Sequence, residues 1–205
     1  MIWLVAGVLW LAFLVWHENW RGRMSPAEVE AFIVGARQRG QDAHNDLEIL
    51  RRFLETDDGR EFFMLNLVKV EAGLVPHPQT GEPTPGPALM NRYSRLFMRR
   101  LLARGGYPAM AARPAGGYVD AWRAPPDPGW TVVGYMRYRS RRDLARLAGD
   151  PAFGGVHAFK IAAMDQTFSF PTRPMILLLA SPRVWVSLAI ALAASLATIA
   201  VLAAG

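Results

Sequence analysis

The sequence predicts an α+β domain flanked by two transmembrane helices, and three observations lead to this prediction. All 40 charged residues lie between Glu18 and Arg183, so both ends of the 205-residue chain are apolar. The charged middle contains one long apolar run, residues 61–71, which is typical of a buried strand. When the first two predicted helices are set aside and neighbouring short pieces are merged, the segments follow the order strand, helix, strand, strand, helix, strand. That order is the ferredoxin-like split βαβ pattern.

Composition excludes several classes of function. The chain has no cysteine, so disulfides, thiolate metal sites and a cysteine nucleophile are excluded. The net charge is +6, but no basic patch with interleaved aromatic residues occurs, so no nucleic-acid partner is expected. A glycine-rich phosphate loop, a G-x-S-x-G elbow and an H-E-x-x-H motif are also missing.

Residues 1–20 are predicted to form the first transmembrane helix. The uncharged residues 1–16 span about 24 Å as a helix, and extension to Trp20 approaches the thickness of a bilayer core of about 30 Å. A cleaved signal peptide would need a basic start and a small-x-small cleavage site, and neither is present. We therefore expect an uncleaved anchor.

Residues 184–205 are predicted to form the second span, because they give about 33 Å of helix without an ionisable side chain. Small residues recur along one face, which permits close packing of helices in lipid, although alanine is common throughout this chain. These residues are Ala189, Ala193, Ala197, Ala200 and Ala204.

Arginines flank both spans on the side of the middle domain, at Arg21, Arg23, Arg173 and Arg183. The positive-inside rule then places the domain in the cytoplasm, beneath the inner (plasma) membrane. Glu18 dilutes the first cluster, so a periplasmic domain is the alternative.

Residues 25–58 are predicted to form a helical lead-in to the domain. Ser25-Pro26-Ala27-Glu28 is a capping box that begins a helix, which Gly40 ends. A second helix is expected to begin near Asn45, and Asp57-Asp58-Gly59 is expected to form a turn.

The domain itself is predicted to cover residues 59–173. After the strand in 61–71, five prolines predict an irregular loop over 73–87, and the apolar periodicity of 88–104 predicts a helix closed by Gly105-Gly106. Two helices are expected after Ser140 and after Asp150-Pro151. The remaining predicted strands are 107–113, 118–123, 130–138 and 167–171.

Several segments of the domain, from about Leu50 to Thr172, resemble the dimeric α+β-barrel superfamily. They are F-F-M-L-N-L-V-K-V, Tyr93 in a helix ending R-G-G, V-V-G-Y-M-R-Y-R-S-R, and D-P-A-F followed by A-A-M. The branch they resemble most is the DUF thirteen-thirty family, which is related to antibiotic-biosynthesis monooxygenases. This resemblance implies a domain of the dimeric α+β-barrel type, a homodimer formed through the sheet, and cofactor-independent oxygenation or isomerisation. The proline-rich insertion and the membrane spans depart from the family.

The resemblance also implies site residues. Haem-degrading members of the superfamily use an Asn, a Trp and a His. Asn66 on the first strand and His157 correspond to the Asn and the His, so these two are the candidate catalytic residues, whereas the Trp position falls near Leu147. Tyr93, Tyr135 and Lys160 are the candidate ligand-binding residues at a pocket between sheet and helices. Lys160 stands where the family often has arginine. Haem bound through His157 is the cofactor alternative, and packing roles for Asn66 and His157 are the structural alternative. No other metal site is expected.

Two functions therefore remain open. In the first, a membrane-anchored barrel protein binds a small apolar or aromatic molecule and is an enzyme of the monooxygenase or isomerase kind. In the second, the protein is a non-catalytic accessory or assembly subunit of a larger membrane complex. The expected partners are the lipid bilayer and either a second copy of the chain or other membrane subunits.

Overall fold

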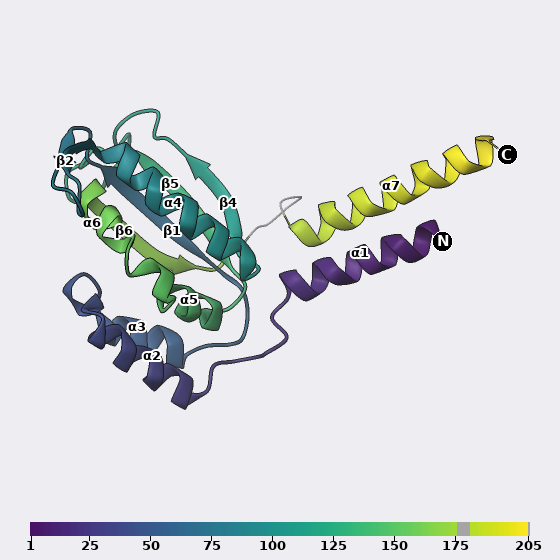
Figure 1. Ribbon diagram of the computed structural model, residues 1–205, viewed down its shortest axis with the longest axis horizontal. Helices are drawn as coiled ribbons and strands as arrows, with labels where there is room; N and C mark the ends of the chain where they lie inside the picture. Colours follow the sequence, from purple (N-terminus) through teal and green to yellow (C-terminus); the bar gives the residue numbers. More distant parts are fainter. Residues whose placement is uncertain (176–180, 205) are drawn as a thin grey trace. The chain divides into compact units, whose positions relative to one another are not determined.

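The computed structural model describes residues 1–175 and 181–204, and the chain divides into two compact units. Residues Arg21–Arg173 form the larger unit, while Met1–Trp20 together with Pro174–Gly205 form the smaller one. The larger unit combines helices with a four-stranded antiparallel sheet, which confirms the predicted α+β class (Figure 1).

The sheet has the strand order β4-β5-β1-β6, and every neighbouring pair is antiparallel. β1 occupies the interior of the sheet, so the long apolar run of the sequence is paired on both sides. In the chain, one helix separates β1 from β4, and two short helices separate β5 from β6, so the predicted order of strands and helices is observed. The elements are β1 (Phe62–Val70), α4 (Gly86–Ala103), β4 (Tyr107–Ala112), β5 (Val132–Tyr138), α5 (Arg141–Ala148), α6 (His157–Ala163) and β6 (Met164–Thr172).

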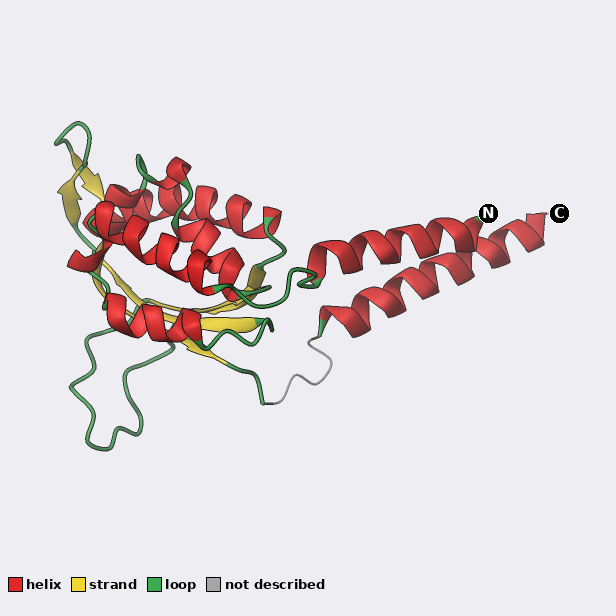
Figure 2. Ribbon diagram, turned by 90° about the horizontal axis from the view of Figure 1, so that it is seen from below, coloured by secondary structure: helices red, strands yellow, loops and turns green. Residues whose placement is uncertain are grey.

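One face of the sheet carries the main core of the domain, because strand side chains alternate between faces. Phe62 and Met64 of β1 point to the helix-covered face, where they pack with residues of α4 and α5 such as Leu101 and Leu147. Figures 1 and 2 show these helices layered on the sheet. The aromatic ring of Phe153 closes the same core.

The opposite face of the sheet, here termed the open sheet face, carries apolar side chains that are half-buried or exposed in the part of the chain that the structure describes, apart from the buried pair Phe63 and Arg137 at one end. Its side chains form two adjacent cross-strand rows: Phe170, Leu65, Tyr135 and Met110 in one, and Phe168, Leu67, Val133 and Ala112 in the next. Phe168 is 61% exposed, Phe170 43% and Met110 47%. Large aromatic side chains are rarely left so exposed on a sheet without a partner.

The helical lead-in consists of α2 (Pro26–Gln38), a 3₁₀ turn (Gln41–Ala43) and α3 (Leu47–Glu55). The predicted capping box at the start of α2 is present: the backbone N–H of Glu28 donates to Ser25 Oγ at 3.3 Å, and the Ser25 N–H donates to Glu28 Oε2 at 2.8 Å. Val29, Ile33 and Leu54 form a second core between the two helices.

Three sequence predictions need correction. The proline-rich segment is not wholly irregular, because β2 (Leu74–Pro76) and β3 (Pro83–Pro85) form a short hairpin. Proline is tolerated in such an isolated two-stranded pair at positions whose backbone N–H is not needed for inter-strand hydrogen bonding. Residues 118–123 form no strand, because no neighbour offers them a ladder. The helix after Asp150 is divided into a 3₁₀ turn (Pro151–Phe153) and α6, with Gly154-Gly155 between them.

The smaller unit contains α1 (Ile2–His17) and α7 (Pro182–Ala204), which lie side by side and antiparallel (Figure 1). The Trp10 indole N–H donates to Ser187 Oγ at 2.9 Å, and Arg183 binds both carboxylate oxygens of Glu18 at 2.6 and 2.9 Å. Among the described residues, α7 is long and apolar enough to cross a membrane, whereas α1 is apolar but shorter. The predicted alanine stripe of α7 is exposed, so α1 packs against a different face.

Candidate functional site

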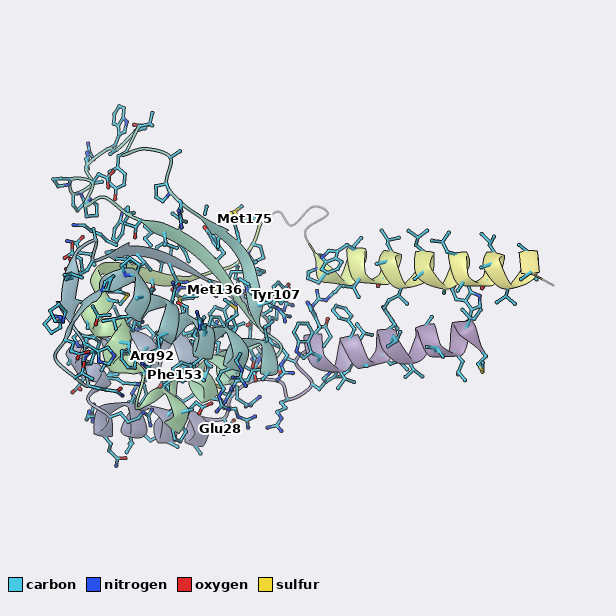
Figure 3. All side chains as sticks on the ribbon, turned by 45° about the horizontal axis from the view of Figure 1, so that its top comes forward. Glu28, Arg92, Tyr107, Met136, Phe153 and Met175 are labelled. Carbon is cyan, nitrogen blue, oxygen red and sulfur yellow. The ribbon has the colours of Figure 1, made fainter. Side chains whose placement is uncertain are left out.

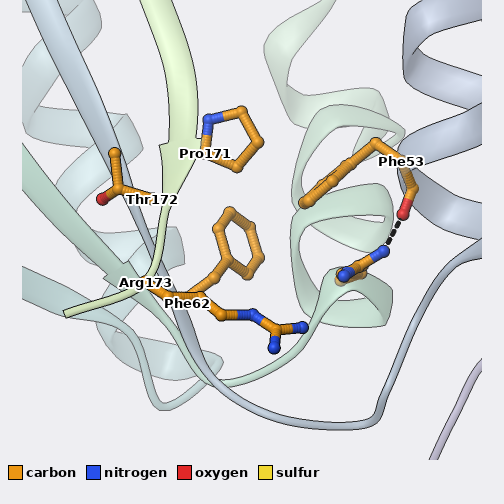
Figure 4. A pocket seen from close by; sticks show the side chains of 6 residues that line it. Phe53, Phe62, Pro171, Thr172 and Arg173 are labelled. Carbon is orange, nitrogen blue, oxygen red and sulfur yellow. Dashed lines mark hydrogen bonds between the residues drawn. The ribbon is translucent and has the colours of Figure 1, made fainter. Parts of the chain in front are cut away.

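A pocket of about 200 Å³ lies between the sheet and the helices, at the end of the domain where β1 begins and β6 ends (Figure 4). Phe53 of α3, Phe62 of β1 and Arg141 of α5 form three of its sides. The last residues of β6, Pro171 and Thr172, complete the wall together with Arg173. The pocket therefore combines apolar walls with two guanidinium groups.

The apolar wall is fixed by aromatic packing. The rings of Phe53 and Phe62 meet edge to face, with centroids 5.2 Å apart, and Phe62 stacks on Tyr138 at the same distance. Phe62 and Tyr138 are buried, so their rings cannot turn away without disrupting the main core. The surface offered to a ligand is thus flat and preorganised.

Arg141 is buried and held by several contacts. Its Nη1 donates to the backbone oxygen of Phe53 and to Thr56 Oγ1, the latter at 2.8 Å, and its guanidinium carbon lies 4.4 Å from the centre of the Phe53 ring. Burial lowers the pKa of Arg141, while Asp57 and Asp58 favour the charged form. A guanidinium stays protonated in proteins, so a fixed positive charge faces the pocket.

The carboxylates that balance these charges are partly occupied elsewhere. Asp57 accepts hydrogen bonds from the N–H groups of Met24 and Gly59 at 2.8 and 3.0 Å, and its oxygen is 3.7 Å from Arg141 Nε. Arg173 is mostly exposed and pairs with Asp58 at 2.6 Å. The lining thus has one rigid cation and one that can change partner.

The residues predicted from the sequence as site residues lie elsewhere, and none of them lines this pocket. Asn66 lies on the helix-facing side of β1 and is used within the sheet: Nδ2 donates to the backbone oxygens of Met64 and Gly134 at 2.9 and 3.4 Å, and Oδ1 accepts from Ser169 Oγ at 3.0 Å. Tyr135 belongs to the open sheet face, because it pairs with Leu65 rather than with Asn66.

Tyr93, His157 and Lys160 do form a group, between α4 and α6. Lys160 Nζ lies 5.7 Å from the centre of the Tyr93 ring, and that ring is 5.9 Å from the ring of Phe153. Burial raises the pKa of Tyr93 to about 12, and burial also lowers the pKa of Lys160. The pKa of His157 is lowered by burial and, to a smaller extent, by the charge of Lys160. The structure thus brings together three of the five predicted residues.

His77, in the β2–β3 turn, is half-buried. Its Nδ1 accepts from the N–H groups of Gln79 and Thr80, both at 3.3 Å, and its ring is 5.2 Å from that of Phe159. It therefore stabilises the β2–β3 turn and its contact with α6. Within the described residues, no group of three His, Asp or Glu side chains is placed to hold a metal ion.

Sequence reasoning missed the residues that line the pocket. In the sequence, Phe53 is one apolar residue of a predicted helix, and Arg173 is a charge that flanks a predicted span. Arg141 follows a recognisable cap at Ser140, but nothing in a local pattern indicates that residues 53, 141 and 173 converge. Only the docking of α3 against the sheet edge brings them together.

Comparisons with known proteins bear on the fold alone. No family model and no curated protein matches this chain. The crystal structure of RPA0582, a protein of unknown function from Rhodopseudomonas palustris, is similar with a TM-score of 0.55 and 20% identity, over 64% of this chain and 95% of that one. A crystal structure of methylated RPA0582 gives a TM-score of 0.53 at 20% identity, over 64% and 93%. The predicted membership of the dimeric α+β-barrel superfamily stays a prediction.

Proposed function

We propose that this protein is a membrane-anchored binding protein for a small molecule with a flat apolar body and an acidic group. The observation that carries this proposal is the pocket in which two aromatic rings and two guanidinium groups line one concave surface. Small-molecule sites are typically apolar clefts with a few placed polar groups, and guanidinium groups match carboxylates in geometry and charge. Aromatic carboxylates are therefore the ligand class that we infer.

Each side of the pocket has a defined role in this proposal. The ligand's ring packs against Phe53 and Phe62, whose mutual orientation is already fixed. Arg141 orients the acidic group without moving, because its own hydrogen bonds hold it. Arg173 exchanges Asp58 for the ligand, which costs little because an exposed ion pair contributes about 0–1 kcal/mol.

Catalysis by this protein is a further step that the resemblance implies. It would be cofactor-independent oxygenation or isomerisation, with Asn66 and His157 as the acting residues. The six lining residues of the pocket include no carboxylate or imidazole that could serve as a general base. Binding, rather than turnover, is therefore the activity that we propose for the pocket itself.

Calorimetry on the full chain in lipid nanodiscs tests the ligand class, with benzoate compared against benzyl alcohol. We expect benzoate to bind more tightly, and Arg173→Gln to weaken it by about tenfold. Phe53→Ala should weaken both compounds. Arg146→Gln, an exposed arginine on α5, is the matched control and should bind as the wild type does. Equal binding of the two compounds, or no effect of Arg173→Gln, would contradict the proposal.

We further propose that α1 and α7 span the membrane together as an antiparallel hairpin, with the domain in the cytoplasm. The Glu18–Arg183 pair places the end of α1 beside the start of α7, so two spanning helices would connect to the domain on the same side. The arginines that follow α1 and precede α7 support the cytoplasmic side. Carbonate washing should leave the chain in the membrane, and protease should reach the domain only in inverted vesicles.

The accessory-subunit function is the second candidate, and the exposed alanine stripe of α7 favours it. If this stripe contacts another membrane subunit, leucine at Ala193 and Ala197 should disperse the complex in mild detergent. The Phe53→Ala variant should leave that complex intact. Copurification that survives the leucine substitutions would exclude the stripe as the contact.

A further inference from the structure

We propose that Lys160 is a reactive amine that forms an imine with a small aldehyde or ketone. This site is separate from the pocket at Phe53 and Arg173, and it does not depend on the function proposed for that pocket. Lys160 lies on α6 with its ammonium group 5.7 Å from the centre of the Tyr93 ring. It is half-buried, so the amine is enclosed by protein but still reachable by a small reagent.

The surroundings of Lys160 offer its charge little compensation. Among the described residues, no carboxylate lies within ion-pair distance of Lys160 Nζ, and no hydrogen-bond acceptor is assigned to it. The neighbouring elements contribute an apolar cluster of Leu89, Phe159 and Ala163, on which Tyr93 and Val156 pack. Phe153 extends this aromatic surface, and Figure 3 shows Phe153 and Arg92 in the helical layer of the domain. An unpaired ammonium in such a site favours its neutral form.

The chain contains a natural comparison, because it has only two lysines. Lys69 at the end of β1 is paired with Asp165 at 2.5 Å, and this hydrogen bond raises the pKa of Lys69. Burial without a partner lowers the pKa of Lys160. At neutral pH the larger fraction of nucleophilic, uncharged amine therefore belongs to Lys160.

The titratable groups around Lys160 are Tyr93 on α4 and His157 on its own helix, with Tyr138 on β5 beyond Tyr93 and His44 beyond His157; Arg92 on α4 lies over the Phe159 ring of α6. The pKa of both tyrosines is raised, so their hydroxyl groups stay protonated and can donate hydrogen bonds. None of these groups is an anion at neutral pH. The Tyr93 ring gives a cation–π contact that favours the charged amine, whereas burial favours the neutral amine and lowers the pKa of Lys160.

The reaction requires only the amine and the carbonyl compound. The Lys160 nitrogen forms a bond to the carbonyl carbon, the carbonyl π bond opens, and a proton moves from nitrogen to oxygen to give a carbinolamine. The hydroxyl then takes up a proton and leaves as water as the nitrogen lone pair forms the C=N bond, and loss of the remaining N–H proton gives the imine. The Tyr93 hydroxyl and the His157 imidazole are the neighbouring groups that can move these protons.

Competitive labelling of the wild-type full chain in detergent tests the proposal. Acetaldehyde with cyanoborohydride traps each imine as an ethylated amine, and peptide mass spectrometry then measures Lys160 and Lys69 in one sample. We expect Lys160 to react about tenfold faster than Lys69 at pH 7, and its rate to level off at a lower pH. In guanidinium chloride the two rates should become equal, because the difference arises from the fold.

Two outcomes would overturn the proposal. In the folded chain, Lys160 could react no faster than Lys69, or it could react slowly and gain rate only in denaturant, which would show that it is shielded rather than activated. Lys69→Arg is the matched variant and should leave the Lys160 rate unchanged. If the Tyr93 hydroxyl transfers a proton in the reaction, Tyr93→Phe should shift the dependence of the Lys160 labelling rate on pH. An unchanged dependence would show that Tyr93 transfers no proton.

Discussion

Arg137 and Lys160 are both enclosed by the larger unit, but only Arg137 has a carboxylate beside it. Arg137 is 1% exposed; its Nε donates to Glu61 at 2.7 Å and its Nη1 to the backbone oxygen of Gly105 at 2.6 Å. Removing one partner of a buried ion pair leaves the other charge buried without a partner, which destabilises the folded state. Removing a buried charge that has no carboxylate partner instead removes its desolvation penalty. The two cations should therefore respond to substitution in opposite directions.

Lys160→Met is expected to stabilise the protein by about 1 kcal/mol at pH 7, because methionine fills the same space without a charge to desolvate. The pKa of Lys160 is lower in the folded than in the unfolded state. Wild-type stability therefore rises as the pH increases from the folded pKa toward the unfolded value of about 10.4. The advantage of the variant should disappear over that range, as measured by urea unfolding followed by circular dichroism.

Lys69→Met is the control for this prediction. It removes a half-exposed ion pair with Asp165 and should leave stability unchanged or slightly reduced. A Lys160→Met protein that is less stable than wild type at pH 7 would show that the amine has a stabilising partner.

At the scale of elements, the ends of the helices are fixed by local chemistry that the sequence displays. Gly105-Gly106 closes the turn after α4: Gly105 has φ of +73°, and the Gly106 N–H donates to the oxygen of Leu101 at 3.0 Å. A β-carbon at Gly106 would lie 2.4 Å from Leu101 Cδ1 and 2.7 Å from the backbone oxygen of Arg137. This turn lets α4 return closely onto the sheet.

Gly106→Ala is accordingly expected to destabilise the protein by about 2–3 kcal/mol, since a backbone oxygen cannot move aside without disturbing β5. Gly116→Ala is the matched control, because a β-carbon there meets no atom within 4 Å. Thermal unfolding of both variants checks the prediction. Equal melting temperatures would mean that α4 and β5 separate at little cost.

The Glu28 carboxylate in the N-terminal cap of α2 should make the folding stability depend on pH. The pKa of Glu28 is lowered to about 2, first by its hydrogen bond with Arg142 and then by the Ser25 N–H. A lowered carboxylate pKa stabilises the folded state above the unfolded pKa of about 4.3, and the contribution is lost as the pH falls toward 2. Because the Glu28 side chain is 39% exposed, we expect Glu28→Gln to cost only about 1 kcal/mol at pH 7.

The same Glu28→Gln substitution should have almost no effect near pH 2, where the wild-type carboxylate is itself becoming protonated. Urea unfolding at both pH values measures the difference. Glu82→Gln, at an exposed position in the β2–β3 hairpin, should show no such pH dependence. A cost of Glu28→Gln that is equal at both pH values would assign its effect to packing.

At the scale of the whole molecule, the open sheet face is the feature that calls for a partner. An antiparallel sheet covered by helices on one side usually buries its other apolar face as well. The two exposed phenylalanines of β6 lie in adjacent rows with Leu65 and Leu67, which makes a continuous apolar surface. We propose a second copy of the chain as the occupant, as the family resemblance implies.

Phe168→Glu is expected to convert a dimer into monomers, because a carboxylate placed in a paired apolar sheet face would lose its hydration without a partner. Mass measurement of the full chain in mild detergent checks this outcome. Ile49→Glu on α3 is the matched control, since Ile49 is 63% exposed but lies away from the sheet. Monomeric wild-type protein would contradict the pairing and leave the face for a different subunit.

Local patterns were sufficient for most of the fold. The capping box at Ser25, the glycines after α4 and the apolar run of β1 each act over a few residues, so the sequence alone indicates where these elements begin and end. Residues 118–123 were misassigned because their apolar side chains resemble a strand, while strand formation requires a neighbour. The charge-free ends likewise indicated α1 and α7 directly.

The candidate site depended on contacts that no local pattern specifies. Strand alternation predicts that successive side chains of β1 lie on opposite faces of the sheet. The register between β1 and β5 decides that Tyr135 lies on the face opposite to Asn66. Phe53, Arg141 and Arg173 come from three distant segments and meet only when α3 docks at the sheet edge. Short-range hydrogen bonding and hydrophobic periodicity thus determined the elements, whereas long-range packing decided which side chains share a pocket.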